Sequence, residues 1–427
     1  MELAADTRLI AQYSPTSTPI LDVLRPVPHE SRAKLSAGEY FFLCSAVILV
    51  LIGLQDILRV LEALGSKLPD LALIGLLVPA CCLGAAALVH ELGHLLAGKI
   101  AGFRLAGLNL SSAAGSNSYE GQKLDACQVL PLGILVLEPG KTDRLPRRLT
   151  ILLLGGPLAS LLAPLVLEAS QYWAQHFLLN VFLNYAVHVF TAVSVLVGLA
   201  ALLPDVSRRG NFSDGARLLM LAKKDELAAR WLAILKLQMA LGRGEHPRKW
   251  DESSVFRATA VNDGSRDAVT AMWLAYLWAS ERQDITSATR YLEDALAAPR
   301  ASSAWLRDRL FVEAAVFQAW FRDNPGKARS WVAQIHGRKL TPLQQQRLNI
   351  ALLWAEGRLF DAWEKTAECF RLLAAMPDSP ARDLAKQSVE EWKRQMESRM
   401  LTRAWRTMYS LSHQMDAAVR QTELSSS

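Results

Sequence analysis

The chain has 427 residues, of which 51% are hydrophobic and 21% are charged. This composition is apolar for a soluble protein, so we expect one part of the chain to lie in a membrane and another part in water. The net charge is +6, and the excess of basic residues lies in the second half. Because no basic run is interleaved with aromatic residues, the charge does not predict a nucleic-acid-binding protein.

Residues 1–39 form a polar N-terminal segment, and four apolar segments follow it. Each of the four is close to or above the length of about 20 residues that a helix needs to cross a bilayer. The gaps between them are alternately rich and poor in Lys and Arg, which predicts that both termini lie in the cytoplasm. We therefore expect a multi-pass protein of the bacterial inner membrane. The four segments cover residues 40–58, 71–98, 149–170 and 177–203.

The region between the second and third apolar segments, residues 101–140, does not have a helical pattern. The sequences "FRLAGLNL" and "ILVLEPG" predict two short strands, and "SSAAGSNS" between them is typical of a turn-rich loop. Two interpretations of this small β insertion stay open. It lies against or dips into the membrane, or it forms a hairpin in the cytoplasm.

From about residue 213 onward the chain has a helical pattern, interrupted by four turn-like breaks at 242–247, 280–284, 322–326 and 356–360. A small residue at helical spacing from apolar partners follows three of these breaks, namely Ala288, Ala328 and Ala362. The recurrence predicts a cytoplasmic, tetratricopeptide-like array of helical hairpins. A generic helical bundle is the alternative. We assign residues 40–225 to the membrane domain, 226–420 to the helical domain and 421–427 to a disordered tail.

The second apolar segment contains the sequence "HELGH" at residues 90–94. His90 and His94 are four residues apart, so they share one helix face and can bind a single Zn²⁺. Zinc lowers the pKa of bound water towards roughly 7, and Glu91 is placed to act as the general acid and base. The alternative is that both histidines form hydrogen bonds with neighbouring helices. Three ionisable groups in an apolar segment are costly without a strong reason.

A catalytic zinc ion usually has three protein ligands and one open position. Asp214, in the sequence "NFSDGARLLML" just after the fourth apolar segment, is the candidate for the third ligand. The alternative is that Asp214 only caps a helix, since Ser-Asp-Gly is a common helix start.

Three motifs occur in order along residues 70–225: "HELGH", "LLGGPLASLLA" and "SDGARL". This combination resembles the site-2 protease family of intramembrane zinc metalloproteases. The resemblance implies that His90, His94 and Asp214 bind zinc and that Glu91 is the catalytic acid and base. It also implies that Gly155, Gly156 and Pro157 shape a substrate cleft, and that the substrate is a membrane-spanning segment cut near the cytoplasmic face.

Two features depart from the family pattern. Ala201 occupies the place of an asparagine that is thought to hold the substrate backbone, and ten positions separate Pro204 from Asp214, where the short family form has only a few. The fourth segment also carries Asn180, Asn184 and His188, which form one polar stripe. They serve interhelical hydrogen bonding or form a wall that contacts substrate.

The resemblance thus implies an intramembrane zinc endopeptidase that acts in regulated intramembrane proteolysis. Its expected partners are a membrane-spanning substrate, the lipid bilayer and a cytoplasmic protein bound by the helical repeats. Two other functions stay open. One is a non-proteolytic membrane adaptor with a vestigial metal site, and the other is a maturation or export factor for small peptides.

Overall fold

The structure is a computed structural model, and it describes residues 68–108, 135–140, 143–174, 181–206, 212–297, 304–335 and 340–425. The chain divides into two compact units, with the main boundary between Glu281 and Arg282. The polar N-terminal segment and the first predicted apolar segment, residues 40–58, lie outside the described residues.

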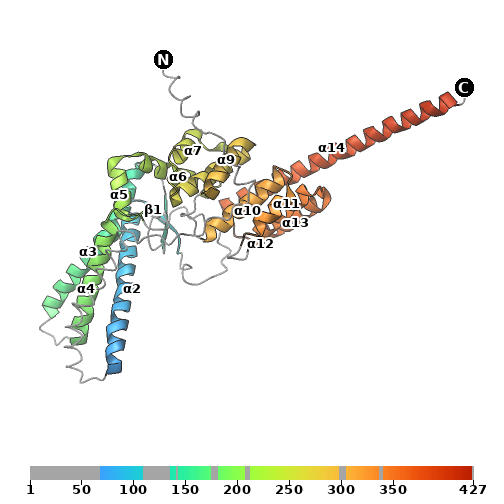
Figure 1. Ribbon diagram of the computed structural model, residues 1–427. Helices are drawn as coiled ribbons and strands as arrows, with labels where there is room; N and C mark the ends of the chain where they lie inside the picture. Colours follow the sequence, from blue (N-terminus) through green and yellow to red (C-terminus); the bar gives the residue numbers. More distant parts are fainter. Residues whose placement is uncertain are drawn as a thin grey trace, which may run out of the picture. The chain divides into compact units, whose positions relative to one another are not determined.

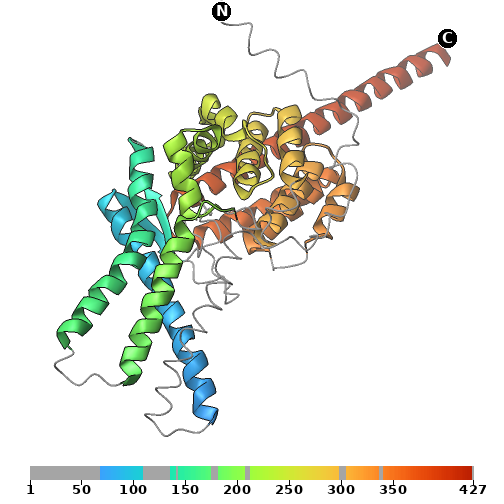
Figure 2. The same ribbon diagram turned by 60° about the vertical axis from the view of Figure 1, so that its left-hand side comes forward.

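Three long apolar helices form the membrane part of the first unit. They are α2 (Leu68–Ile100), α3 (Leu145–Ala174) and α4 (Val181–Leu202). Each packs against the other two, and Figures 1 and 2 show them side by side. All three are long and apolar enough to cross a membrane. This confirms three of the predicted apolar segments as helices and supports a membrane protein.

The three-helix bundle exposes apolar side chains and buries small polar ones. Leu88, Leu92 and Leu96 of α2 are exposed, whereas Ser160 and Ser194 are fully buried between helices. This distribution suits a protein surrounded by lipid, where apolar groups gain nothing from burial and polar groups need partners inside. Polar atoms are therefore concentrated where the helices meet.

Two glycines bring α2 and α3 into backbone contact. A Cβ atom added to Gly93 would lie 2.3 Å from the carbonyl oxygen of Gly155, and one added to Gly155 would lie 2.5 Å from that of Gly93. Only glycine permits such an approach, which is a common way for membrane helices to pack. The contact fixes α3 beside the "HELGH" turn of α2.

The predicted β insertion contains two antiparallel strands, β1 (Phe103–Leu108) and β2 (Leu135–Pro139). Phe103 pairs with Pro139, and the register shifts between Leu105 and Gly107. Both strands lie where the sequence predicts them. The residues between them, 109–134, lie outside the described residues.

After α4 the first unit continues with short helices. They are α5 (Asp214–Lys223), α6 (Glu226–Gly242), a 3₁₀ turn at Pro247–Lys249, α7 (Glu252–Thr259) and α8 (Arg266–Glu281). Leu145 and Leu149 at the start of α3 share a buried core with Met220 of α5 and Trp231 of α6. This core holds α5, which carries Asp214, against the end of the membrane bundle.

The second unit is made of helices. They are α9 (Ile285–Ala297), α10 (Ala304–Trp320), α11 (Pro325–Val332), α12 (Pro342–Ala355), α13 (Leu359–Ala374) and α14 (Pro380–Ser425). All four predicted breaks fall between helices, and Ala288, Ala328 and Ala362 are fully buried. The described protein is therefore all-α with one small sheet.

The last helix differs from the expectation for the C-terminus. The sequence predicts a disordered tail at 421–427, whereas α14 continues to Ser425. The preceding residues are rich in strong helix formers without glycine, and a helix propagates readily through such a sequence.

Candidate metal centre

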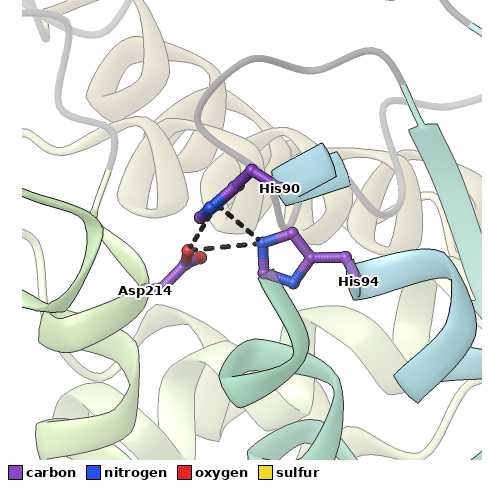
Figure 3. A group of neighbouring side chains, drawn as sticks. All are labelled: His90, His94 and Asp214. Atoms are coloured by element: carbon purple, nitrogen blue, oxygen red, sulfur yellow. Dashed lines mark hydrogen bonds and ion pairs between the residues drawn. The ribbon is translucent and has the colours of Figure 1, made fainter. Parts of the chain in front are cut away.

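Two helices bring the predicted ligand residues together. His90 and His94 project from one face of α2, and Asp214 is the first residue of α5 (Figure 3). The two Nε2 atoms are 3.1 Å apart, and Oδ2 of Asp214 lies 3.4 Å from Nε2 of His90 and 3.3 Å from Nε2 of His94. All three side chains are buried. The structure thus contains a buried His-His-Asp group that can hold a metal ion.

The dimensions of this triangle fit a tetrahedral metal ion. Zinc bonds to imidazole nitrogen and carboxylate oxygen are roughly 2.0–2.2 Å long, which places ligand atoms roughly 3.3–3.5 Å apart at tetrahedral angles. The three observed separations are 3.1, 3.4 and 3.3 Å. The side chains can therefore bind such an ion with small adjustments of the imidazole rings.

Hydrogen bonds on the far side of each imidazole orient both rings. Nδ1 of His94 lies 2.8 Å from the carbonyl oxygen of Leu152, and Nδ1 of His90 lies 3.0 Å from Oγ of Ser160. A carbonyl oxygen only accepts, so Nδ1 of His94 carries a proton, and Nε2 of the neutral imidazole would present its lone pair to a metal ion. The amide of Gly156 also lies 3.3 Å from that Nδ1, but this longer contact cannot coexist with the protonated nitrogen as a hydrogen bond. Metal-binding histidines commonly have this arrangement.

The glycines of the "LLGGPLASLLA" motif make room for the site. A Cβ atom on Gly156 would lie 2.2 Å from Nε2 of His94, and the neighbouring Gly155 packs against Gly93. Pro157 lies inside α3, and its carbonyl oxygen faces Gly198 of α4. A Cβ atom added to Gly198 would lie 3.2 Å from that oxygen. These contacts are between helices, and the role of the motif in a substrate cleft stays a prediction.

The structure separates the two interpretations of Asp214. Ser213, not Asp214, is the cap of α5, since its Oγ accepts a hydrogen bond from the amide of Ala216 at 3.1 Å. Neither carboxylate oxygen of Asp214 has a hydrogen-bond partner among the described residues. Burial alone would raise the pKa of Asp214, but its contacts with His90 and His94 outweigh burial and hold this pKa below its usual value.

The loop between Pro204 and Asp214 is closed by hydrogen bonds between its two ends, so its length does not move Asp214 away from the end of α4. The amide of Ser213 donates to the carbonyl oxygen of Asp205, and the amide of Asp205 donates to Oγ of Ser213, both at 3.0 Å. An antiparallel β-bridge between Val206 and Phe212 also joins the two ends of the loop. The loop therefore begins and ends at the same place. Residues 207–211 within it lie outside the described residues.

Glycine is also required where α5 begins. A Cβ atom on Gly215 would lie 1.9 Å from the carbonyl oxygen of Leu202, the last residue of α4. This close approach places Asp214 directly beside the end of the membrane bundle. Ala201 precedes Leu202 in the same last turn of α4.

Glu91 lies beside the triangle and is buried with it. Neither of its carboxylate oxygens has a hydrogen-bond partner among the described residues. It lies within electrostatic range of His94 and Asp214. A buried carboxyl group without a partner is costly, so a fold retains one only where it serves a purpose.

The polar stripe of α4 is not brought to the metal centre. Asn184 and His188 are exposed on α4, and His188 lies about four helical turns before Leu202. Asn180 lies outside the described residues. A role of the stripe in contacting substrate stays a prediction.

Arg217 is a residue near the site that the sequence did not single out. It lies one helical turn after Asp214 in α5, is buried, and forms two hydrogen bonds to Asp267 of α8, at 2.5 and 2.8 Å. Its guanidinium group also lies 4.6 Å from the ring centre of Phe212 and 4.4 Å from that of Trp231. These contacts hold α5, and hence Asp214, in place.

Neither Arg217 nor Ser160 could be assigned a role from a local pattern. The ion pair of Arg217 joins residues 50 positions apart, and nothing near either residue signals the other. Ser160 had a weak signal, since it lies one helical turn after Gly156 on the same side of α3.

Comparisons of the chain with protein-family models, with curated proteins and with solved structures found no match.

Proposed function

We propose that the protein is an intramembrane zinc endopeptidase of the site-2 protease type. The observation that carries this proposal is the buried triangle of His90, His94 and Asp214 at the end of three apolar helices. A two-histidine, one-carboxylate set can also bind iron. Two histidines one turn apart with a glutamate between them are typical of zinc peptidases, so we favour zinc.

Each residue has a distinct role in this proposal. His90, His94 and Asp214 would hold Zn²⁺ and leave one of four positions open. Zinc bound there would act as a Lewis acid and increase the acidity of water. Glu91, which is buried and without a hydrogen-bond partner among the described residues, would remove a proton from the attacking water and deliver it to the leaving amine.

The substrate would be a membrane-spanning protein, cut near the cytoplasmic face. A helical amide is shielded by its own hydrogen bonds, so the substrate must unwind locally before its carbonyl can reach Glu91 and the metal. Water must also reach this buried site from the aqueous side. Both requirements favour a site at the end of the bundle, where Asp214 lies next to the last turn of α4.

We further propose that helices α10–α14 form a tetratricopeptide-like array that binds a cytoplasmic protein. A spacing of 34 residues recurs in their contacts, which is the period of that repeat. The pairs are Glu313 with Arg347, Trp320 with Trp354, and Trp363 with Glu397. This recurrence favours a repeat array over a generic helical bundle.

The test of the peptidase proposal is to separate metal binding from cleavage. Elemental analysis measures zinc and iron in the purified protein, and a model transmembrane peptide reports cleavage. In Glu91→Gln, zinc should stay bound while cleavage falls by about 10²–10⁴-fold, because only the acid and base is lost. In His94→Ala, zinc and cleavage should fall together.

Asp214→Asn is the decisive variant. Asparagine keeps the size of the aspartate side chain but is a much poorer zinc ligand, so zinc occupancy or cleavage should drop sharply. An Asp214→Asn protein with full zinc and full activity would refute the three-ligand site. A wild-type protein that binds partners but cleaves nothing would instead support the adaptor, and one that cleaves only short peptides would support the maturation factor.

A further inference from the structure

A cavity of about 260 Å³ lies between the start of α3 and helices α6 and α7, and no residue of the candidate metal centre lines it. Three of its lining residues are cationic, namely Arg144, Lys236 and Arg257, and none is acidic. The other lining residues are the hydroxyl-bearing Ser254 and five apolar residues, Leu145, Pro146, Ala229, Leu232 and Ala233. The cavity thus combines an apolar wall with a cluster of positive charge.

These three cations have no acidic partner among the described residues. Other arginines in the same unit are paired, since Arg217 binds Asp267 and Arg230 binds Asp263 at 2.8 Å. All three side chains are solvent-exposed, and three positive charges around one cavity attract an anion. The cavity is therefore suited to an anionic ligand.

The position of the cavity indicates where such an anion comes from. Leu145 lines the cavity and is also the first residue of the membrane span Leu145–Ser170. The 26 residues of this span extend about 39 Å as a helix, more than the roughly 30 Å of hydrocarbon and close to the roughly 40–45 Å that includes both headgroup layers. The start of α3, and the cavity with it, therefore lies at the level of the lipid headgroups.

A neighbouring aromatic side chain agrees with this depth. Phe256, next to Arg257 in α7, is 51% exposed although it is large and apolar. Amphipathic helices that lie at the headgroup layer commonly combine Phe, Trp or Leu with Lys and Arg. Leu145 itself is buried in the core of the unit, so the cavity has a firm wall on that side.

We propose that this cavity binds the phosphate group of an anionic phospholipid in the leaflet on the side of the metal centre. Arg144, Lys236 and Arg257 would contact the phosphate oxygens, and the hydroxyl of Ser254 would donate a hydrogen bond. The apolar wall would contact the glycerol and the first acyl carbons. This site is independent of the peptidase proposal, because none of its residues belongs to the metal centre.

The test uses the full chain, purified in a neutral detergent. Isothermal titration calorimetry measures binding of three probes: dioctanoyl-phosphatidylglycerol, which is anionic, dioctanoyl-phosphatidylcholine, which is zwitterionic, and inorganic phosphate. The cavity triple is the variant with Arg144→Gln, Lys236→Gln and Arg257→Gln. Each basic residue near an anionic lipid surface contributes about fivefold in affinity, so the cavity triple should bind phosphatidylglycerol about 100-fold more weakly than the wild type.

A matched control removes three charges of the same unit that do not line the cavity. In the variant with Arg243→Gln, Arg248→Gln and Lys249→Gln, phosphatidylglycerol affinity should change by less than about twofold. If the cavity triple fails to fold, Arg257→Gln alone, on the exposed side of α7, should still lower affinity by about fivefold.

Three results would overturn the proposal. Equal weakening in both triple variants would mean that lipid binds to the general positive charge. Inorganic phosphate that binds as tightly as phosphatidylglycerol and competes with it would identify a site for free phosphate. Absence of saturable binding of any probe to the wild-type protein would remove the site. Saturable binding of phosphatidylglycerol alone, lost only in the cavity triple, supports it.

Discussion

At the scale of single residues, the site depends on which nitrogen of each histidine carries the proton. The Leu152 carbonyl fixes this for His94, because it can only accept a hydrogen bond. For His90 the partner is the hydroxyl of Ser160, which can donate or accept. The backbone carbonyl of Ser160 is itself bonded by Ser194 at 2.8 Å, so α4 helps to hold this part of α3 in place. Ser160 of α3 therefore orients His90 of α2, one of the proposed ligands.

We expect Ser160→Ala to lower zinc affinity by about 10–100-fold, the usual effect of removing a hydrogen-bond partner of a ligand. Without the hydroxyl, Nδ1 of His90 loses its partner and Nε2 is no longer held toward Asp214. Competition with a fluorescent zinc chelator measures the affinity.

Ser170→Ala is the control for this experiment. Ser170 lies on the same helix, is exposed, and donates only to the nearby carbonyl oxygen of Leu167. Zinc affinity should be unchanged in that variant. If Ser160→Ala also bound zinc as tightly as the wild type, His90 would not be oriented through Ser160.

At the scale of elements, α5 is a short helix whose position determines where Asp214, the third proposed ligand, lies. Its first residue is Asp214, and its next turn carries Arg217, which pairs with Asp267 of α8 between two aromatic rings. A ten-residue helix has little stability of its own, so these tertiary contacts determine where it lies. The ion pair thus links the metal centre to a helix 50 residues further along the chain.

We expect Asp267→Asn to reduce zinc affinity as well as thermal stability. The guanidinium of Arg217 would lose its bidentate partner while buried, which costs about 1–3 kcal/mol once the partial exposure of Asp267 is considered. Because α5 would shift, Asp214 would leave the position that fits the metal. Differential scanning calorimetry and zinc competition measure the two effects.

Asp263→Asn is the matched control. It breaks the ion pair with Arg230, which is also buried in the first unit but lies in α6 and does not hold Asp214. Stability should fall there too, whereas zinc affinity should not. If both variants lost zinc equally, general loss of stability would explain the result and the specific role of Arg217 would be wrong.

At the scale of the whole molecule, apolar length and helix breaks were predictable because they depend on local sequence. The apolar segments of α2, α3 and α4 and the four turns between later helices lie where the sequence predicts them. His90 and His94 were predictable because ionisable residues stand out in an apolar segment, whereas the sequence around Asp214 fits a helix start equally well and only the resemblance favoured a ligand. Contacts between distant residues, such as Gly156 with His94, were not predictable, since only the packing of α3 on α2 shows why a glycine is needed there.

The arrangement of the spans makes a final prediction about topology. Three ends of the bundle meet at the metal centre: the end of α2 carries His94, the start of α3 contacts it through Leu152, and the end of α4 abuts Gly215. Helices that cross a membrane in succession alternate in direction. Points after residues 125 and 225 should therefore lie on the same side, and a point after residue 173 on the other.

Reporter fusions in a bacterial host measure this. Alkaline phosphatase, which is active only outside the cytoplasm, should be active after residue 173 and inactive after 125 and 225, because the Lys- and Arg-rich gaps favour the cytoplasm. Green fluorescent protein placed before Met1 tests the segment at 40–58, and it should fluoresce if that segment is a fourth span. Phosphatase activity after residue 225 would put the metal centre on the outer face. If the N-terminal fusion does not fluoresce while the other results are as expected, the chain crosses the membrane three times. Its N-terminus then lies on the side opposite the metal centre.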